Sequence, residues 1–282
     1  MVTGDDFGLA APVNDAIETA HREGILTAAS LMVGEEAAPD AVMRARRLPS
    51  LKVGLHLVVA RGKPVLSPAQ IPHLVGPDGR FSTALVWTGI RIFFGRKARA
   101  ELAREIAAQF EAFRATGLTL DHVNAHNHMH LHPTVLSLIL KIGPRYGLKA
   151  VRVPHEPFLP SFRAARRGLV ARFATSALLL PWLALMRYRL RRAGLACNDY
   201  VFGLNDTGRM GLEAVTGVLE NLPPGVSEIY LHPATFAWPG RDPGMAGYRC
   251  EDELAALVHP AVSEIVRRSG VECIGFCDLA AA

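Results

Sequence analysis

The sequence predicts an α/β protein whose strands are mostly parallel, in an open sheet or a barrel, and two observations carry this prediction. Stretches with the apolar pattern of strands alternate with amphipathic helical stretches along most of the chain. Polar residues suited to catalysis stand where several predicted strands end, which is where parallel α/β folds place their active sites. The 282 residues, 50% of them hydrophobic, suffice for one large domain or two small ones.

The individual elements are predicted from the spacing of apolar residues. Helical periodicity is clear over residues 12–23, 40–48, 98–116, from Pro133 onward and over residues 252–269. Strands are predicted over residues 25–33, 51–59, 149–154, 228–233 and 271–276, and in the histidine-rich stretch before Pro133. In the strand over residues 51–59 the apolar side chains share one face and leave His56 on the other. The long loop predicted over residues 60–83 is of a kind that is often functional.

Composition excludes several classes of protein. No apolar run reaches the roughly 18–20 residues that cross a bilayer, and acidic residues follow Met1 too closely for a signal peptide. The four cysteines lack CxxC spacing, which is typical of reduced thiols rather than of a disulfide framework. We therefore expect a cytoplasmic protein. The net charge of +5 arises locally, so no nucleic-acid partner is expected, whereas a homodimer remains open.

Residues 161–196 form a basic, apolar insertion that differs in kind from the rest of the chain. Eight arginines flank an uncharged run over residues 173–186, which contains Trp182 and is too short to span a bilayer. Such a segment can lie in a membrane interface, which would make the protein peripheral to the inner membrane. It can equally be a buried helical pair with arginines on a solvated rim. The sequence leaves both interpretations open.

A row of histidines stands between a predicted strand and a predicted helix. Its members are His122, His126, His128, His130 and His132. If the whole row were strand, the last four would line one face at about 6–7 Å per step. A metal–imidazole bond measures about 2.0–2.1 Å, so one ion could bind at most two neighbours, and its other ligands must come from elsewhere. A metal-binding tract without function is the alternative.

Four polar groups at predicted strand ends suggest a hydrolytic site. They are the pair Asp5 and Asp6, His56, the histidine row, and His232. One carboxylate and two imidazoles suit a divalent ion that keeps open positions for water. A second carboxylate could take a proton from that water, and a histidine across the site could protonate a leaving group or support an oxyanion. The pair of aspartates could instead be a helix cap or a turn.

Four motifs resemble those of the YdjC-like carbohydrate deacetylases. They are TGDDFGL from Thr3, GLHL from Gly54, HVNAHNHMH from His122 and EIYLHP from Glu228, and they occur in the family's order from one end of the core to the other. Each motif is weak alone, but the four together are specific. The TGDDFGLA, NAHNHMHLHP and YLHPAT sequences are similar to the subtype associated with hopanoid biosynthesis.

The resemblance implies a fold and a reaction. The fold is one domain over residues 1–282, a deformed (β/α) barrel with mostly parallel strands, carrying the basic, apolar helical insertion at about residues 161–196. The reaction is removal of an N-acetyl group from an amino sugar with the help of one divalent ion, magnesium or zinc. For the hopanoid subtype the implied substrate is a lipid-linked amino sugar, an N-acetylglucosaminyl hopanoid.

The resemblance also implies roles for residues that match the family's motifs. Asp6, His56 and His126 match the metal ligands, Asp5 the general base, His232 an acid or oxyanion support, and His128 and Arg152 the wall of the pocket. One position departs from the pattern, because Asn124 stands where the family has aspartate. That departure puts a role for a carboxylate at this position in doubt.

Three other interpretations of the protein's function remain. The substrate could be a soluble chitooligosaccharide or another N-acyl sugar. The protein could be a non-catalytic, membrane-associated metal-binding protein, although the full set of candidate residues argues against a decayed site. A deacetylase of the polysaccharide-deacetylase type also uses two aspartates and two histidines, but its histidines are typically spaced HxxxH rather than HxH.

The family resemblance implies a longer first strand than the few residues that precede the acidic pair in this sequence. Members of the family usually carry several apolar residues before this pair, so we expect the native start to lie upstream of Met1. A protein extended by upstream strand residues should melt at a higher temperature, because a longer strand buries more apolar surface. Thermal unfolding of the two proteins compares them, and equal melting temperatures would contradict the expectation.

Overall fold

The computed structural model describes residues 1–279 and contains a sheet of six parallel strands. The strands lie side by side in the order β4-β3-β2-β1-β6-β5. Their bounds are β1 Val2–Phe7, β2 Ala28–Leu31, β3 Lys52–Leu57, β4 Val123–Ala125, β5 Tyr200–Phe202 and β6 Ser227–Leu231. Because every neighbouring pair is parallel, the carboxyl ends of all six strands meet at one end of the sheet.

The two edges of the sheet are joined by an irregular segment, residues 149–155. On one side the Arg152 amide donates to the Val123 carbonyl at 3.1 Å, and the Val123 amide donates to Ala150. On the other side the Val151 amide donates to Ala196 at 3.0 Å, and the Val201 amide donates to His155. The sheet therefore curls into an irregular barrel, which confirms the predicted deformed (β/α) barrel.

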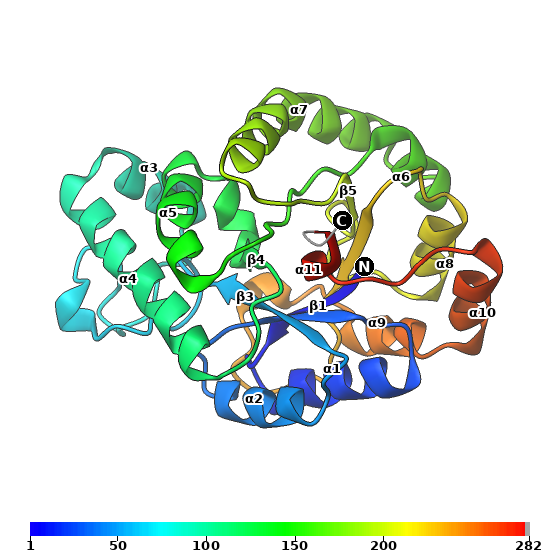
Figure 1. The fold of residues 1–282 in the computed structure, drawn as a ribbon, viewed down its shortest axis with the longest axis horizontal. Coiled ribbons are helices and arrows are strands. Elements are labelled where there is room, and N and C mark those ends of the chain that lie inside the picture. The colour runs from blue at the N-terminus through cyan, green and yellow to red at the C-terminus, as the bar shows by residue number, and fades with distance from the viewer. Residues whose placement is uncertain (280–282) are drawn as a thin grey trace.

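Helices form a ring around the strands (Figure 1). They are α1 Ala11–Glu23, α2 Ala38–Arg46, α3 Leu85–Phe94, α4 Arg96–Ala115, α5 Pro133–Ile142, α6 Phe158–Ala165, α7 Leu169–Arg192, α8 Leu212–Glu220, α9 Cys250–Leu257, α10 Pro260–Ser269 and α11 Phe276–Leu279. Short 3-10 turns cover Pro68–Gln70, His126–Leu131, Gly143–Tyr146 and Pro243–Met245. The insertion predicted at residues 161–196 corresponds to part of α6 and to α7.

The strands send apolar side chains outward to the helices and polar side chains into the barrel. On β3, Val53, Leu55 and Leu57 belong to the core beneath the helices, whereas His56 points inward, as the alternation predicts. The inward-facing residues are almost all polar. They are Thr3, Asp5, Ser30, His56, His122, Asn124, Arg152, Glu228 and Tyr230, each 2% exposed or less. The barrel interior is thus mostly a hydrogen-bonded network, and a small apolar cluster of Met1, Ala150 and Phe276 packs beside it.

Three predicted elements differ in the structure. The helix expected over residues 252–269 breaks at Pro260, where His259 caps α10 by accepting the Ala261 amide. The strand expected over residues 271–276 is an irregular segment, and Asp121 accepts the amides of Phe276 and Cys277 beyond it. The strand expected over residues 149–154 forms only isolated bridges. Helices α3, α8 and α11 and strand β5 were not predicted.

Helix α7 is longer than the uncharged run that the sequence shows. It extends over 24 residues and is long and apolar enough to cross a membrane, by length and composition alone. Only 17% of its most apolar stretch is buried in the protein. Leu183, Met186 and Leu190 are nevertheless fully covered and belong to the barrel's core. The uncharged run over residues 173–186 is only part of α7, because the helix continues through the arginines that flank the run.

Gly54 leaves the space that the His122 ring occupies inside the barrel. A Cβ at Gly54 would lie 2.4 Å from Cε1 of His122, a ring that Asp121 and Ser30 hold in place. We expect Gly54→Ala to lower the free energy of unfolding by about 1–3 kcal/mol, as overpacked cores do. Chemical denaturation measures this change.

Gly89, within α3, provides the matched control. A Cβ there would meet nothing nearer than His132 at 3.6 Å. Gly89→Ala should therefore be neutral or stabilise by up to about 1 kcal/mol, because alanine is the better helix former. Equal destabilisation by the two substitutions would show that the crowding at His122 is not the cause.

Candidate active site

A cavity of about 330 Å³ opens at the carboxyl ends of the strands. Its lining includes Asp5, Asp6, His56, His126, His128, Tyr230 and His232 from the barrel, and Arg61, Leu85, Leu204, Thr207, Asp242 and Tyr248 from loops and α3. The position follows from the parallel sheet, because all strand ends and the loops that leave them face this side. The cavity is large enough for a small ligand such as a sugar ring.

Asp5 and Asp6 both face the cavity although they are neighbours on β1. Adjacent residues of a regular strand point to opposite faces. Here the pairing of β1 with β2 shifts register between Gly4 and Phe7, and Asp6 adopts a left-handed backbone with φ of 63°. Such a conformation costs a non-glycine residue about 1–3 kcal/mol and is typical of functional sites. The irregular strand end therefore turns two carboxylates into one pocket.

Asp6, His56 and His126 form the centre of the cavity. One ligand atom from each lies within 4.8 Å of the others, and all three residues are buried. Asp6 Oδ1 lies 3.0 Å from His126 Nδ1 and 3.3 Å from His56 Nε2. Asp6 Oδ2 and His56 Nε2 make no hydrogen bond with any of residues 1–279. Unpaired buried groups are costly, and a divalent cation would satisfy these atoms, so the residues fit a metal site.

Asn124 fixes the tautomer and the orientation of the His56 ring. The Asn124 Oδ1 atom accepts a hydrogen bond from Nδ1 of His56 at 2.6 Å. A neutral imidazole carries one ring proton, so this bond leaves the lone pair of Nε2 directed at Asp6. A hydrogen-bond acceptor behind a metal-binding histidine usually has this effect. The asparagine thus does for His56 what the aspartate of related motifs could do.

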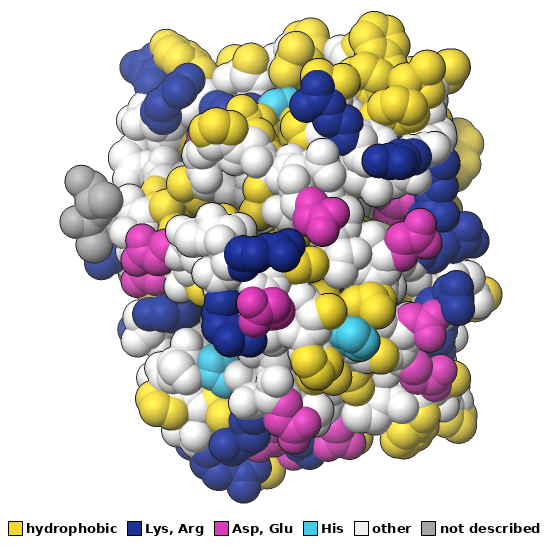
Figure 2. Space-filling view, turned by 90° about the vertical axis from the view of Figure 1, so that its right-hand side faces the viewer, with side chains coloured by type: hydrophobic (Ala, Val, Ile, Leu, Met, Phe, Trp, Pro, Cys, Tyr) yellow, Lys and Arg dark blue, Asp and Glu magenta, His cyan; other side chains and the backbone are white. Residues whose placement is uncertain are grey.

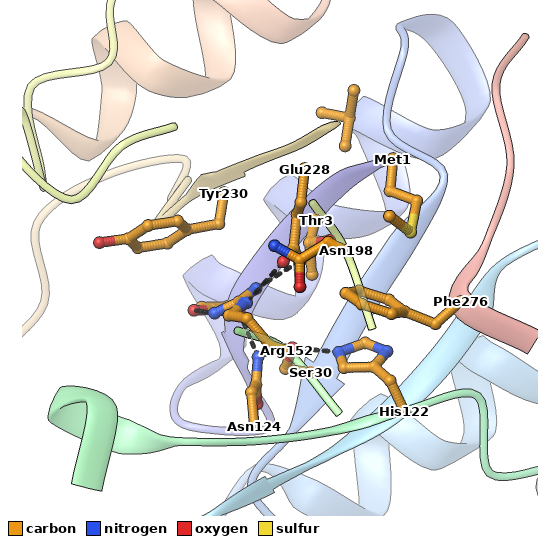
Figure 3. A network of polar contacts seen from close by, with 12 residues as sticks. Met1, Thr3, Ser30, His122, Asn124, Arg152, Asn198, Glu228, Tyr230 and Phe276 are labelled. Atoms are coloured by element: carbon orange, nitrogen blue, oxygen red, sulfur yellow. Dashed lines mark hydrogen bonds and ion pairs between the residues drawn. The ribbon is translucent and has the colours of Figure 1, made fainter. Parts of the chain in front are cut away.

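A chain of polar contacts runs from Asn124 through the barrel (Figure 3). The amide of Asn124 donates to Asp5 Oδ1 at 3.2 Å and to Ser30 Oγ at 2.8 Å. Ser30 Oγ contacts His122 Nε2 at 3.1 Å, and His122 Nδ1 contacts Asp121 at 2.8 Å. His122 therefore supports the site from the far end of the barrel.

Arg152 holds Asp5 in its ionised form. Its guanidinium donates to Asp5 at 2.6 and 3.0 Å and to Glu228 at 2.7 and 2.8 Å, and it stacks on Tyr230. Burial raises the pKa of Asp5, but the charge and hydrogen bonds of Arg152, together with smaller contributions from His56 and His232, outweigh burial and set this pKa well below its usual range. The structure thus places Arg152 behind Asp5, fully buried, rather than in the pocket wall where the family resemblance put it.

His232 faces the cavity from the end of β6. Its Nδ1 has no hydrogen-bond partner among the described residues. Burial lowers the pKa of His232, so its ring is neutral near pH 7. Glu253 fixes the backbone by accepting the His232 amide at 2.6 Å and the Met210 amide at 2.8 Å. Across the pocket from Asp5, a neutral imidazole with a free nitrogen can exchange a proton with a ligand.

The histidine row is not a continuous strand beyond Ala125. Asn127 and His128 adopt left-handed backbone conformations, with φ of 51° and 52°, and the chain turns through a 3-10 segment. His126 therefore reaches Asp6, and His128 lines the cavity with Nε2 3.0 Å from the Tyr230 hydroxyl. The alternating face that a strand would have given does not form.

The remaining histidines of the row take other positions. His130 is fully buried, and His122 lies within the barrel. His132 caps α5 by accepting the Thr134 amide. Burial lowers the pKa of His130 well below its usual value, so it too is neutral.

Sequence reasoning missed several residues of the cavity. Tyr230 shares the strand parity of Glu228 and His232, so the alternation of β6 could have indicated it. Arg61, Thr207, Asp242 and Tyr248 come from loops, and only the folded chain brings them together. Arg61 and Asp242 pair at 3.0 Å and join two distant loops beside the cavity.

Comparison with known proteins places the chain in a family. Residues 1–268 match the YdjC-like protein family, so the chain belongs to it. Relatives named carbohydrate deacetylase include one from Brevibacillus brevis, 39% identical over 55% of this chain and 58% of its own length. One from Geobacillus stearothermophilus is 37% identical over 57% of this chain and 63% of its own length. One from Vibrio vulnificus YJ016 is 42% identical over 52% and 55%. The chain thus aligns with little more than half the length of these relatives.

A solved structure shares the fold over nearly the whole chain. It is a protein from Enterococcus faecalis V583 whose given name refers to cleavage of cellobiose phosphate. It superposes with a TM-score of 0.74 at 22% identity, covering 99% of this chain and 97% of the other. At this identity the likeness supports the barrel architecture alone.

The contact between Asn124 and His56 predicts a graded effect on metal binding. Asn124→Ala removes the acceptor of the His56 Nδ1 proton and should weaken binding of a divalent cation about 10–100-fold. Asn124→Asp keeps an oxygen acceptor and should retain most of the affinity. Calorimetric titration with Zn²⁺ measures both variants. Equal affinities of Asn124→Ala and the unmodified protein would show that His56 needs no such support.

Proposed function

We propose that the protein is a metal-dependent deacetylase that removes the N-acetyl group of an amino sugar and releases acetate. The observation that carries this proposal is the cluster of Asp6, His56 and His126 in one cavity with an ionised Asp5 and a neutral His232. The names of the relatives support the carbohydrate substrate. The imidazoles favour zinc over magnesium, although the carboxylate suits either ion.

Asp6, His56 and His126 would hold the ion. A divalent ion bound there would lower the pKa of a water and polarise the amide carbonyl. Asp5, ionised and oriented by Arg152, can accept the proton of that water at a carboxylate oxygen. His232 faces the same space. Its neutral ring can donate a hydrogen bond to the oxyanion, or it can accept the proton that Asp5 took from the water and pass it to the leaving nitrogen. His128, held by Tyr230, and the rest of the wall position the sugar.

We further propose that the amino sugar is the headgroup of a lipid, an N-acetylglucosaminyl hopanoid. The sequences TGDDFGLA, NAHNHMHLHP and YLHPAT support this subtype. Exposed apolar side chains on α3 and α7 also suit a substrate presented at a membrane. A soluble chitooligosaccharide is the competing substrate, and it fits the same chemistry without these surfaces.

Release of acetate tests the proposed substrate. The purified protein is incubated with an N-acetylglucosaminyl hopanoid in detergent micelles or with N-acetylglucosamine oligomers, each with and without a chelator. We expect release from the lipid, lost on chelation and restored by added Zn²⁺ or Mg²⁺. Release from the soluble oligomers alone would keep the chemistry and reject the lipid. Release from neither substrate by the metal-loaded protein would reject an N-acetylglucosamine substrate.

Two substitutions separate the roles of the acidic pair. Asp5→Asn should keep the bound metal and lower turnover at least about 100-fold, because it removes the proton acceptor and leaves the three ligands intact. His126→Ala should lose both metal and turnover. Metal content of the purified variants and their acetate release provide the two readouts. Loss of metal from Asp5→Asn with turnover intact would reverse the assignment of Asp5 and Asp6.

A further inference from the structure

Large apolar side chains are exposed on two elements that the proposed reaction does not use. On α3, Val86 is 75% exposed, Trp87 68% and Phe94 72%. On α7, Val170 is 77% exposed and Leu178 81%. Others on these helices and on α6 include Ile90, Phe93, Leu159, Leu169, Phe173, Leu180 and Leu185. Yellow side chains crowd the top of the molecule, where α7 lies (Figure 2). Concentrated exposure of this kind marks an interaction surface.

Both elements adjoin the mouth of the active-site cavity. Leu85, the first residue of α3, lines the cavity directly. The start of α7 is tied to the loop after β5, because Arg167 and Arg172 pair with Asp206 at 3.0 and 2.5 Å. Leu204 and Thr207, on that same loop, line the cavity. The cavity is therefore bordered by the first residue of α3 and by the loop to which the start of α7 is tied.

Charge is sorted along the chain in the same way. Residues 82–100 and 161–196 hold twelve of the 31 lysines and arginines and none of the 26 acidic residues. The rest of the chain then has 19 basic residues against 26 acidic ones, so the basic charge belongs to the apolar elements. Arg91, Arg96, Arg163 and Arg166 are exposed beside the apolar side chains. Exposed arginines among aromatic and aliphatic side chains complement anionic lipid headgroups.

Helix α7 lies along the protein rather than leaving it to cross a bilayer. Leu183, Met186 and Leu190 are 1% exposed or less and pack into the barrel's core. At its other end Arg172 is 4% exposed and pairs with Glu156 and Asp206. Crossing a bilayer would expose this core and unpair these buried charges, which is costly. A bilayer could still receive the exposed side of the helix.

We propose that α3, α6 and the first half of α7 form a face that docks the mouth of the cavity onto an anionic lipid bilayer. The face carries the apolar side chains that enter the headgroup region and the arginines that contact lipid phosphates. Docked in this way, the cavity opens toward the lipid surface, so a headgroup enters it without leaving the membrane. This last step rests on the proposed function, whereas the docking does not.

A second copy of the chain fits this face less well. A symmetric dimer would place the same patch of each subunit against its partner. Two stretches that each hold many arginines and no acid would then meet, and like charges across an interface are unfavourable. Anionic lipid supplies the opposite charge and accepts the apolar side chains at the same time.

Vesicle flotation of the full chain tests the proposal. The probes are vesicles of phosphatidylcholine alone and of phosphatidylcholine with phosphatidylglycerol, without any substrate. We expect binding to the anionic vesicles, weakened by salt, and little binding to the neutral ones. The double variants Trp87→Ser/Phe94→Ser and Val170→Ser/Phe173→Ser should each reduce the bound fraction at least tenfold. Because these side chains are exposed, the variants should fold, which circular dichroism verifies.

Met43 provides a control on the opposite side of the barrel from α7 (Figure 1). It is 57% exposed, as much as Phe173, but lies on α2. Met43→Ser should leave vesicle binding unchanged. Light scattering without lipid reports self-association: a dimer that both double variants abolish, in a protein that does not float, would overturn the proposal in favour of a self-interface. Equal flotation of the double variants and the unmodified protein would also overturn it.

Docking and catalysis have separate readouts. If the protein releases no acetate from any substrate but floats as expected, the proposed function fails and the docking stands. If the double variants cleave detergent-solubilised substrate normally but act slowly on the same lipid in vesicles, docking serves the reaction. If the double variants no longer float but still cleave the lipid in vesicles at the normal rate, the face does not serve the reaction, and its proposed role in substrate access is overturned.

Discussion

The fully buried Arg152 is the group on which the interior of the barrel depends. It lies between Asp5 and Glu228, bonds to both, and stacks on Tyr230. Removing one partner of a buried ion pair costs about 3–5 kcal/mol, because the other charge is left without compensation. Here two carboxylates share one cation, so the ion pairs connect β1, β6 and the irregular segment that closes the barrel. The same contact that stabilises the fold keeps Asp5 ionised at the site.

The polar interior explains why the site can be both buried and ordered. Hydrogen bonds link inward-facing side chains in series, from Asp121 through His122 and Ser30 to Asn124. A buried network of this kind is stabilising only when its members are satisfied. At the cavity the pattern changes, because Asp6 Oδ2, His56 Nε2 and His232 Nδ1 have no partner among residues 1–279. These three unsatisfied atoms lie where a ligand would be bound.

Backbone strain collects at the same place. Asp6, Asn127 and His128 all adopt left-handed conformations, and β1 shifts register beside Asp6. A regular strand would have aimed Asp5 and Asp6 apart and would have spread the histidines along one face. The irregular ends bring Asp6, His56 and His126 within reach of one ion. The strand ends lose regular hydrogen bonding in adopting that geometry, which is common at functional sites.

The sequence by itself determined the class of fold and most of the central cluster. Alternating strands and helices predicted the parallel α/β architecture, and the period of β3 placed His56 opposite the apolar face, because local periodicity reflects which face is buried. The motifs identified the family and brought Asp5, Asp6, His126 and His232 into one hypothesis. Tertiary structure decided the rest. It moved Arg152 behind Asp5, added the loop residues Thr207 and Tyr248, and gave Asn124 its role, since contacts between distant segments leave no local pattern. It also left the apolar sides of α3 and α7 uncovered, because only the packed chain shows which apolar residues find partners and which remain on the surface.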